Sequence, residues 1–279
     1  MSAKRQGPRL DIRHGRIDLS HGAGGRAMGQ LIAELFHAEF DNAWLRQGND
    51  QAAFEVPAGR MVMSTDAYVI SPLFFPGGDI GSLAVHGTIN DLAMAGATPL
   101  YLSASFILEE GFPLADLQRI ARSMGEAARA AGVPVITGDT KVVERGKADG
   151  VFISTAGVGA VPAGLDLSGD RALPGDIVIV SGTIGDHGVA VMSKRKNVEF
   201  ETALTSDSAP LHTLVGSMVA AAGDCLRLMR DPTRGGLAAT LNEIAQQSGV
   251  GIRLAATNRK KRTIQRKRAQ ESPGSLTAI

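Results

Sequence analysis

The order of apolar segments between residues 61 and 161 constrains the fold more than any other feature of the sequence. The segments predict, in order, a strand, a helix, a strand, a helix and two strands: 61–70, 80–97, 100–108, 114–131, 133–143 and 151–161. Apolar residues at helical spacing make the second helix the clearest of these, and Gly132 ends it. Crossovers followed by a hairpin-like pair of strands favour an α+β domain over a doubly wound sheet.

A glycine-rich segment precedes an earlier helix, which the apolar spacing places over residues 27–40. Gly22, Gly24 and Gly25 lie directly before it. Glycines at this position leave bare backbone N–H groups beside the positive end of a helix, where an anion such as phosphate can bind. A flexible turn explains the same glycines equally well.

A second domain is predicted after residue 161, because residues 162–174 cluster Pro, Gly and Asp between two apolar strands. We therefore expect one domain over 1–161, an incomplete α/β domain over 162–254 and a basic tail over 255–279. The elements predicted in the second domain are a strand at 176–181, helices at 186–195, 210–229 and 234–248, and the start of a strand at 250–254.

The basic residues are concentrated near the end of the chain. Residues 259–268 hold seven basic side chains, whereas residues 1–258 hold 22 basic and 27 acidic ones, a net charge of −5. The acidic body predicts no nucleic-acid binding. The tail begins without a turn signal, so we interpret it as foreign to the domain, from a frameshift, and as disordered by self-repulsion. A nonspecific contact with nucleic acid or a membrane surface is the alternative for the tail alone.

The single cysteine and the lack of a long apolar run exclude other classes. Cys225 cannot form an intrachain disulfide, and within the predicted helix it is interpreted as a small buried residue rather than a reactive thiol. No segment approaches 18 uninterrupted apolar residues, and no apolar stretch follows the basic start of the chain. We expect a cytoplasmic protein without a membrane segment.

Acidic side chains surround the predicted helix 80–97. Asp66 ends a strand, Asp79 lies in the turn before the helix, and Asp91 lies within it. Because this helix is otherwise small and apolar, Asp91 should be buried, and an unpaired buried carboxylate is costly, so Asp91 should meet a cation. His86 and Asn90, four residues apart, predict a polar stripe that faces something other than solvent. A buried core histidine explains His86 equally well.

Several carboxylates without a histidine–cysteine cluster favour Mg²⁺, which prefers oxygen ligands and is often completed by water and nucleotide phosphates. Lys141, after Gly138 and Asp139, could neutralise phosphate charge during transfer. The chain has neither a P-loop nor a protein-kinase motif set. A nucleotide site here therefore belongs to neither common class.

Seven segments match one family when they are taken together: 21–25, 64–72, 75–81, 85–96, 136–143, 181–188 and 230–237. They closely resemble the HypE family of hydrogenase maturation proteins, and the resemblance runs from about residue 12 to 254. This family belongs to the superfamily of aminoimidazole ribonucleotide synthetase and selenophosphate synthetase. The resemblance implies a two-domain fold whose N-terminal domains pair into a dimeric β-barrel.

The resemblance also implies a site for ATP and Mg²⁺. It suggests metal ligands, a phosphate loop, and further binding or catalytic groups. The residues are, respectively, Asp66, Asp79, Asp91 and Asp231; Gly22, Gly24 and Gly25; and His86, Asn90, Gly138, Asp139 and Lys141.

The implied activity is that of an ATP-dependent carbamoyl dehydratase, a lyase. In the family, HypF carbamoylates a C-terminal cysteine, ATP activates the thiocarboxamide oxygen, and loss of phosphate leaves a thiocyanate. The cyanide then passes to iron on the HypC–HypD complex, for nickel–iron hydrogenases. This chain ends in Thr277, Ala278 and Ile279 in place of a Pro-Arg-Ile-Cys-like end. We expect nucleotide binding without thiocyanate formation, and uncovered apolar surface and low stability in the second domain.

Two other functions fit parts of the sequence. One is a different ATP-dependent activity of the superfamily, selenophosphate synthesis or a small-molecule kinase. Selenophosphate synthetases normally carry a reactive cysteine or selenocysteine near the glycine loop, where this chain has His21 and Ala23. The other is a catalytically silent protein that binds ATP or docks on HypF.

Overall fold

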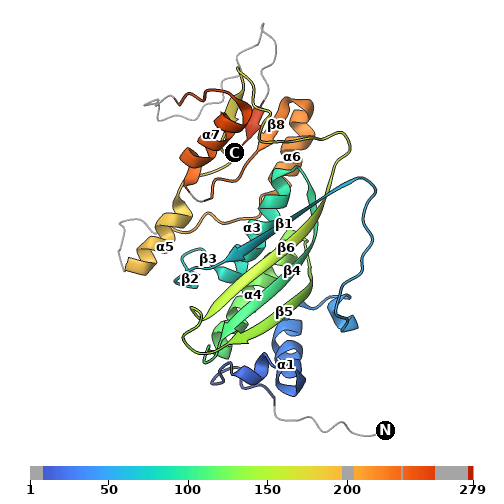
Figure 1. Cartoon of the computed structure of the whole chain (residues 1–279), viewed down its shortest axis with the longest axis vertical. Helices are drawn as coiled ribbons and strands as arrows, with labels where there is room; N and C mark the ends of the chain where they lie inside the picture. The colour runs from blue at the N-terminus through green and yellow to red at the C-terminus, as the bar shows by residue number, and fades with distance from the viewer. Residues whose placement is uncertain (1–8, 197–203, 234, 255–275, 279) are drawn as a thin grey trace.

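A four-stranded sheet forms the centre of the N-terminal part (Figure 1). The structure is a computed structural model, and it describes residues 9–196, 204–233, 235–254 and 276–278. The strand order is β1-β6-β4-β5, with β6 antiparallel to β1 and β4, and β5 parallel to β4. Its strands are β1 (Arg60–Tyr68), β4 (Thr98–Glu109), β5 (Val135–Val143) and β6 (Val151–Val161). The predicted α+β fold is confirmed.

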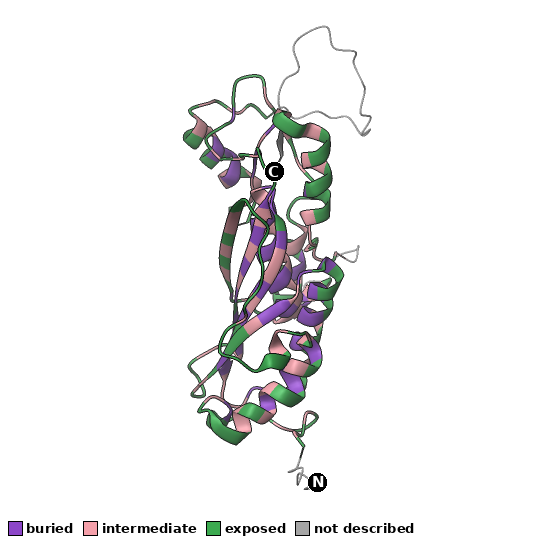
Figure 2. Cartoon of the chain, turned by 90° about the vertical axis from the view of Figure 1, so that its right-hand side faces the viewer, coloured by how far each residue is buried: buried purple, intermediate pink, exposed green. Residues whose placement is uncertain are grey.

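Two helices cover one face of this sheet, and Figure 2 shows the buried residues between them. In α4 (Leu114–Ala131), Leu117, Ile120 and Met124 are fully buried, as the helical spacing predicts. The other helix, α3 (Ile80–Met94), is apolar almost all round because it packs on α4, on β1 and β6, and on a helix of the second part. A short hairpin of β2 (Phe74–Phe75) and β3 (Gly78–Asp79) leads into α3.

The opposite face of the sheet carries exposed apolar side chains. Met63 of β1 is 72% exposed and Ile107 of β4 is 41% exposed. Residues alternate between faces along a strand, so the less exposed neighbours of these residues point toward α3 and α4. One face of the sheet is therefore a protein core, and the other is open.

The helix predicted over 27–40 is a helical run with a π turn in its middle. It consists of α1 (Gly25–Leu31), the π turn η2 (Ile32–Phe36) and α2 (His37–Phe40). Two 3₁₀ turns flank it, η1 (Leu19–His21) and η3 (Leu45–Gln47). None of the helices in the described part of the chain has the length and apolar character needed to cross a bilayer.

The second part contains a parallel three-stranded sheet of order β7-β9-β8. Helix α7 packs against it through a cluster that includes Leu228, Leu241 and Ile244, and α6 packs against the end of α3. The elements are β7 (Ile177–Ile179), α5 (Asp186–Lys196), α6 (His212–Ala222), the 3₁₀ turn η4 (Gly223–Cys225), β8 (Leu226–Met229), α7 (Gly236–Ser248) and β9 (Leu276–Ala278).

Three predictions for the second part are wrong in detail. The helix predicted over 210–229 ends at Ala222, since Gly223 adopts φ +51°, and the last four residues form β8 instead. Cys225 consequently lies half-buried at the end of a 3₁₀ turn rather than inside a helix. The strand predicted at 250–254 is irregular chain, although Val250 and Ile252 pack on the α7 cluster.

Of the predicted basic tail, residues 255–279, the structure describes only residues 276–278. Residues 276–278 form β9, which lies between β7 and β8, so this short stretch is ordered sheet rather than disordered tail. The prediction for residues 255–275 and 279 lies outside the described residues.

Candidate functional site

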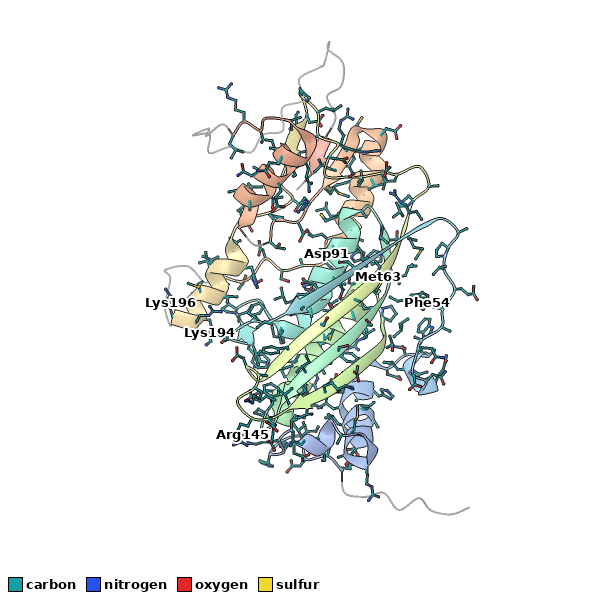
Figure 3. The ribbon with its side chains drawn as sticks, viewed as in Figure 1. Phe54, Met63, Asp91, Arg145, Lys194 and Lys196 are labelled. Carbon is teal, nitrogen blue, oxygen red and sulfur yellow. The ribbon has the colours of Figure 1, made fainter. Side chains whose placement is uncertain are left out.

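Three predicted acidic residues meet where β1, α3 and the chain after β8 come together. Asp66 lies near the end of β1, Asp91 in the last turns of α3 (labelled in Figure 3), and Asp231 two residues after β8. Burial raises the pKa of Asp91, and the negative charges of Asp231 and Asp66 raise it further. Crowded carboxylates of this kind repel one another unless a cation lies between them. We call Asp66, Asp91 and Asp231 the acidic trio.

The local structure explains why these side chains converge. Ser64 and Asp66 are two residues apart on β1 and so point to the same face, toward α3. The Ser64 hydroxyl donates a 2.7 Å hydrogen bond to Oδ2 of Asp91, which opposes the rise in the pKa of Asp91 and fixes the orientation of the carboxylate. Sequence reasoning gave Ser64 no role, although its spacing from Asp66 placed both on one face.

The donor atoms of the acidic trio fit a hard divalent cation such as Mg²⁺, because all of them are oxygens. In the ranges that the structure describes, no three His, Cys, Asp or Glu side chains lie together closely enough to hold a metal ion by themselves. Phosphate and water oxygens would therefore have to complete the coordination, as Mg²⁺ commonly requires.

Asp79, predicted as a fourth ligand, caps the N-terminus of α3. Its Oδ1 atom accepts hydrogen bonds from the backbone N–H of Gly81, at 2.8 Å, and of Ser82, at 3.0 Å. In turn, the backbone N–H of Asp79 donates a hydrogen bond to the Ser82 hydroxyl, which completes a capping box. Burial raises the pKa of Asp79, and the bonded backbone N–H groups oppose that rise. Its geometry is that of a cap, separate from the acidic trio.

A second group of predicted residues lies on β5, at the opposite edge of the sheet. The Lys141 Nζ atom is 3.0 Å from Oδ2 of Asp139, and both side chains are more than half exposed. The hydrogen bond from Lys141 holds the pKa of Asp139 below its usual value. Asp66 and Gly138 lie in one row of paired residues across the sheet. Three strand spacings, about 14 Å, separate these two residues. Within a single chain the β5 group therefore lies apart from the acidic trio.

The glycine loop, Gly22 to Gly25, begins against β5, the strand that carries Asp139 and Lys141. A Cβ atom on Gly22 would lie 2.6 Å from the backbone nitrogen of Val142, so only glycine permits this approach to β5. Gly24 and Gly25 have φ of +79° and +80° and open space around them. Beside the loop, a hollow of about 220 Å³ separates the helical run 25–40 from β5. Its lining includes Phe36, Phe106 and the residues Gly138, Asp139 and Thr140.

His86 and Asn90 face protein, as the predicted polar stripe requires. The Nδ1 atom of His86 lies 3.0 Å from the Ser208 hydroxyl, and burial lowers the pKa of His86. Asn90 donates to the carbonyl of Ala209 and accepts from the N–H of Leu211. Both residues of the stripe therefore contact one segment of the second part. Nothing in the sequence pattern identified that segment as the partner.

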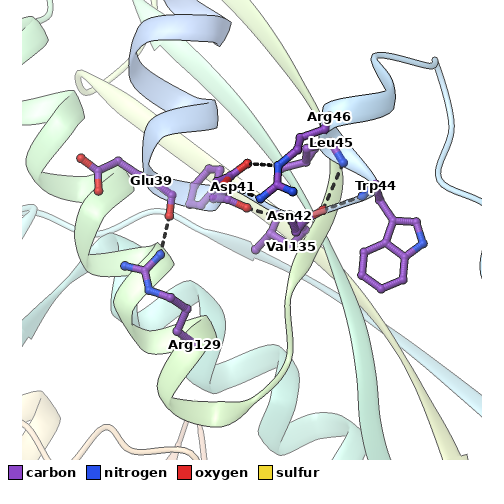
Figure 4. Close-up of polar contacts among 9 residues, drawn as sticks. Glu39, Asp41, Asn42, Trp44, Leu45, Arg46, Arg129 and Val135 are labelled. Carbon is purple, nitrogen blue, oxygen red and sulfur yellow. Dashed lines mark hydrogen bonds and ion pairs between the residues drawn. The ribbon is translucent and has the colours of Figure 1, made fainter.

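A second hollow, of about 250 Å³, lies between the segment 39–42 and the end of α4. Figure 4 shows the polar contacts of this region. Arg129 donates to the Glu39 carbonyl at 2.7 Å, and Asn42 donates to the Val135 carbonyl at 2.8 Å. Asn42 also accepts from the N–H groups of Trp44 and Leu45. These contacts fasten the chain before β1 to the sheet. None of the predicted site residues lines this hollow.

The class of protein follows from matches to two family models, which cover most of the chain. Residues 48–161 match the N-terminal domain, and residues 174–273 the C-terminal domain, of the AIR synthase related proteins. The chain is thus a two-domain protein of this class.

Within the class, the chain belongs to the carbamoyl dehydratase HypE family. It is 76% identical over 246 residues to carbamoyl dehydratase HypE of Rhizobium leguminosarum bv. viciae, covering 88% of this chain and 70% of that protein. It is 47% identical over 244 residues to HypE of Escherichia coli (strain K12), covering 86% of this chain and 72% of the relative.

Two solved structures extend the likeness to the fold. The structure of hydrogenase maturation protein HypE in complex with ATP superposes with a TM-score of 0.80 at 53% identity, over 82% of this chain and 68% of that one. HypE in a HypE–HypF complex gives a TM-score of 0.67 at 51% identity, over 78% of this chain and 70% of that one.

Proposed function

We propose that the chain binds ATP with Mg²⁺ at the acidic trio and that its site is that of an ATP-dependent carbamoyl dehydratase. The reaction dehydrates a cysteine S-carboxamide to a thiocyanate, the source of the cyanide ligands on iron in nickel–iron hydrogenases. The approach of Asp66 and Asp231 to Asp91 carries this proposal, because a cation bound among the three carboxylates would relieve their mutual repulsion and keep Asp91 ionised. The likeness to HypE in complex with ATP supports it.

The residues of the trio have different parts in this proposal. Asp91, oriented by Ser64, and Asp66 hold the cation from the N-terminal part, while Asp231 approaches from the second part. Mg²⁺ held by these residues would supply a positive charge that offsets the negative charge of the nucleotide phosphates. The carboxylates must be ionised to bind it, so the raised pKa of Asp91 makes protons effective competitors of the metal.

A homodimer would explain the two separated groups. The sheet has an open apolar face, including Met63 and Ile107, and among the described strands β1 and β5 lie at its two edges. We propose that two sheets close into a barrel in which β5 of one protomer meets β1 of its partner. Lys141 and Asp139 of one chain would then approach the acidic trio of the other, and Lys141 could bind the ATP phosphates.

Calorimetry with ATP, in the presence of Mg²⁺ or of a chelator, tests the nucleotide site. We expect heat of association with Mg²⁺ and its loss in an Asp91→Asn variant. Asp116→Asn, on the first turn of α4, is the matched control, because it removes a carboxylate from the same domain away from the trio. Absence of Mg²⁺-dependent binding in the parent chain would contradict the proposal.

Mixed dimers test the shared site. Asp91→Asn chains and Lys141→Ala chains should each fail to bind Mg²⁺–ATP. After co-refolding, a mixed dimer contains one site with both defects and one site with neither, so about half of the mixed dimers' sites should bind. No recovery in a verified mixed dimer would contradict the joining of β5 to β1.

HypF is proposed as a partner because a relative at 51% identity was solved in a HypE–HypF complex. The family also implies the HypC–HypD complex. A cytoplasmic location stays a prediction. Mass spectrometry after incubation with HypF, carbamoyl phosphate and ATP tests whether the chain forms a thiocyanate.

A further inference from the structure

Residues 204–211 lie against the N-terminal part as an extended segment, which we call the strap. Its exposure alternates, with Leu204, Ser206 and Ser208 half-buried and the residues between them exposed. The Ser206 N–H donates to the Pro76 carbonyl at 2.8 Å. Alternation with a period of two is the pattern of extended chain lying on a surface. The strap thus presents every second residue to the protein body.

Helix α3 holds the strap at two points, one helical turn apart. His86 contacts the Ser208 hydroxyl at 3.0 Å. Asn90 uses both ends of its amide, because Nδ2 donates to the Ala209 carbonyl at 3.0 Å and Oδ1 accepts from the Leu211 N–H at 2.8 Å. Both polar ends of the Asn90 amide are thus bonded to the strap backbone, which uses one of its two N–H donors and one lone pair of its oxygen.

A third contact fixes the start of the strap. The Nδ1 atom of His187, in α5, lies 2.9 Å from the Ser206 hydroxyl, and the His187 N–H donates to Asp207 at 3.0 Å. The His187 ring also packs edge-on against Phe75, with centroids 5.2 Å apart. The strap is therefore held from α3, from α5 and from the hairpin that leads into α3.

The strap continues directly into the elements that carry Asp231. Helix α6 follows it, then β8, and Asp231 comes two residues after β8. Ala93, near the end of α3, packs in one cluster with Val215 of α6 and Leu226 and Met229 of β8. The position of Asp231 relative to α3 thus depends on this small cluster and on the hydrogen bonds of the strap.

We infer that Asn90, assisted by His86, is a positioning residue that holds the strap on α3 and thereby sets Asp231 opposite Asp91. The inference rests on the proposed function, since it concerns the geometry of the same Mg²⁺–ATP site. It gives Asn90 a different role from the nucleotide contact predicted by the family resemblance: Asn90 acts on the site through the second part of the chain.

The test combines amide hydrogen exchange of the full chain without nucleotide and calorimetry with Mg²⁺–ATP. Asn90→Ala should speed exchange of the strap, above all at Leu211, and raise the Kd by about tenfold through loss of two hydrogen bonds. Ser208→Ala, which alters the strap and leaves α3 intact, should change both quantities in the same direction by a smaller factor. Asn242→Ala is the matched control, because this exposed asparagine donates a hydrogen bond to the Ala238 carbonyl within α7, away from the strap, and it should change neither.

Other results of this test would contradict the inference or the proposed function. If Asn90→Ala weakens binding while strap exchange stays at the parent rate, Asn90 contacts the nucleotide directly and the inference is wrong. If strap exchange rises while the Kd is unchanged, the strap does not position the site, and the inference is again wrong. A parent chain that binds no Mg²⁺–ATP would remove the proposed function and the positioning role with it, whereas strap exchange would still show whether Asn90 holds the segment. Ser208→Ala keeps the inference testable if Asn90→Ala does not fold.

Discussion

The two parts of the chain bury their apolar side chains in different ways. In the N-terminal part, one continuous cluster joins the sheet to α3, α4 and the helical run 25–40. In the second part, the described residues form two small clusters, and one of them includes Ala93 of α3. Large apolar side chains are exposed on and after β7, with Ile177 59% and Ile184 60% exposed.

This difference indicates how each part is stabilised. Burial scales with the apolar area removed from water, so the N-terminal part has a core of its own. The second part depends more on contacts with α3 and the strap. A site built from both parts, such as the acidic trio, is therefore only as well positioned as the contact between them. The predictions below test that comparison.

The same substitution should have unequal effects in the two cores. Leu117→Ala, at a fully buried position of α4, should lower the free energy of unfolding by about 3–5 kcal/mol, because the large surrounding core cannot collapse into the cavity. Leu241→Ala in α7 should lower it by about 2–3 kcal/mol, because the smaller cluster can relax. Urea unfolding of the two variants measures both values. Equal losses would show that the second core is as tightly packed as the first.

Removal of the trio carboxylate that comes from the second part should act on binding rather than on folding. Asp231→Asn should raise the Kd for Mg²⁺–ATP by about 100-fold, since a charged ligand becomes neutral. It should leave the melting temperature of the nucleotide-free chain unchanged or raise it, because repulsion within the trio is relieved. Calorimetry and thermal unfolding give the two values. Unchanged affinity would place Asp231 outside the site.

Asp79 should show the opposite pattern from the trio. Asp79→Ala should lower the free energy of unfolding by about 1–2 kcal/mol through loss of the α3 cap, whereas Asp79→Asn should retain most of the stability because asparagine also caps helices well. Neither change should alter the affinity for Mg²⁺–ATP in the folded protein. A large loss of affinity in Asp79→Asn would instead support the original prediction that Asp79 is a metal ligand.

The raised pKa of Asp91 predicts the smallest effect, a dependence on pH. Because burial and neighbouring charges raise its folded pKa above the unfolded value, ionised Asp91 opposes folding. Stability of the metal-free chain should therefore fall as the pH rises from the unfolded to the folded pKa of this group. Affinity for Mg²⁺–ATP should change in the opposite sense and fall as the pH drops through the raised pKa. Asp91→Asn should remove the stability change, and an unaltered profile would contradict the assignment.

Much of the fold follows from the sequence because local periodicity decides which face of an element is buried. The spacing in α4 predicted its buried residues correctly. Asp91, predicted to be buried because α3 is otherwise apolar, is only half-buried, since it lies at the side of α3 that meets β1 and the chain after β8. The break at Gly223 was missed, because the apolar residues on both sides fit a single helix and the positive φ became visible only in the folded chain. The capping role of Asp79 could have been predicted from Ser82, three residues later.

The sequence by itself determined that the chain has strands and helices in a fixed order, a helix with an acid that needs a cation, and glycines beside a helix start. Only the tertiary structure decided which of these residues meet. Strand order differs from chain order, so Asp66 and Asp139 lie at opposite edges of one sheet, while Asp231 joins Asp91 across 140 residues of chain. Periodicity is a local property, whereas proximity between distant segments depends on how their buried faces pack.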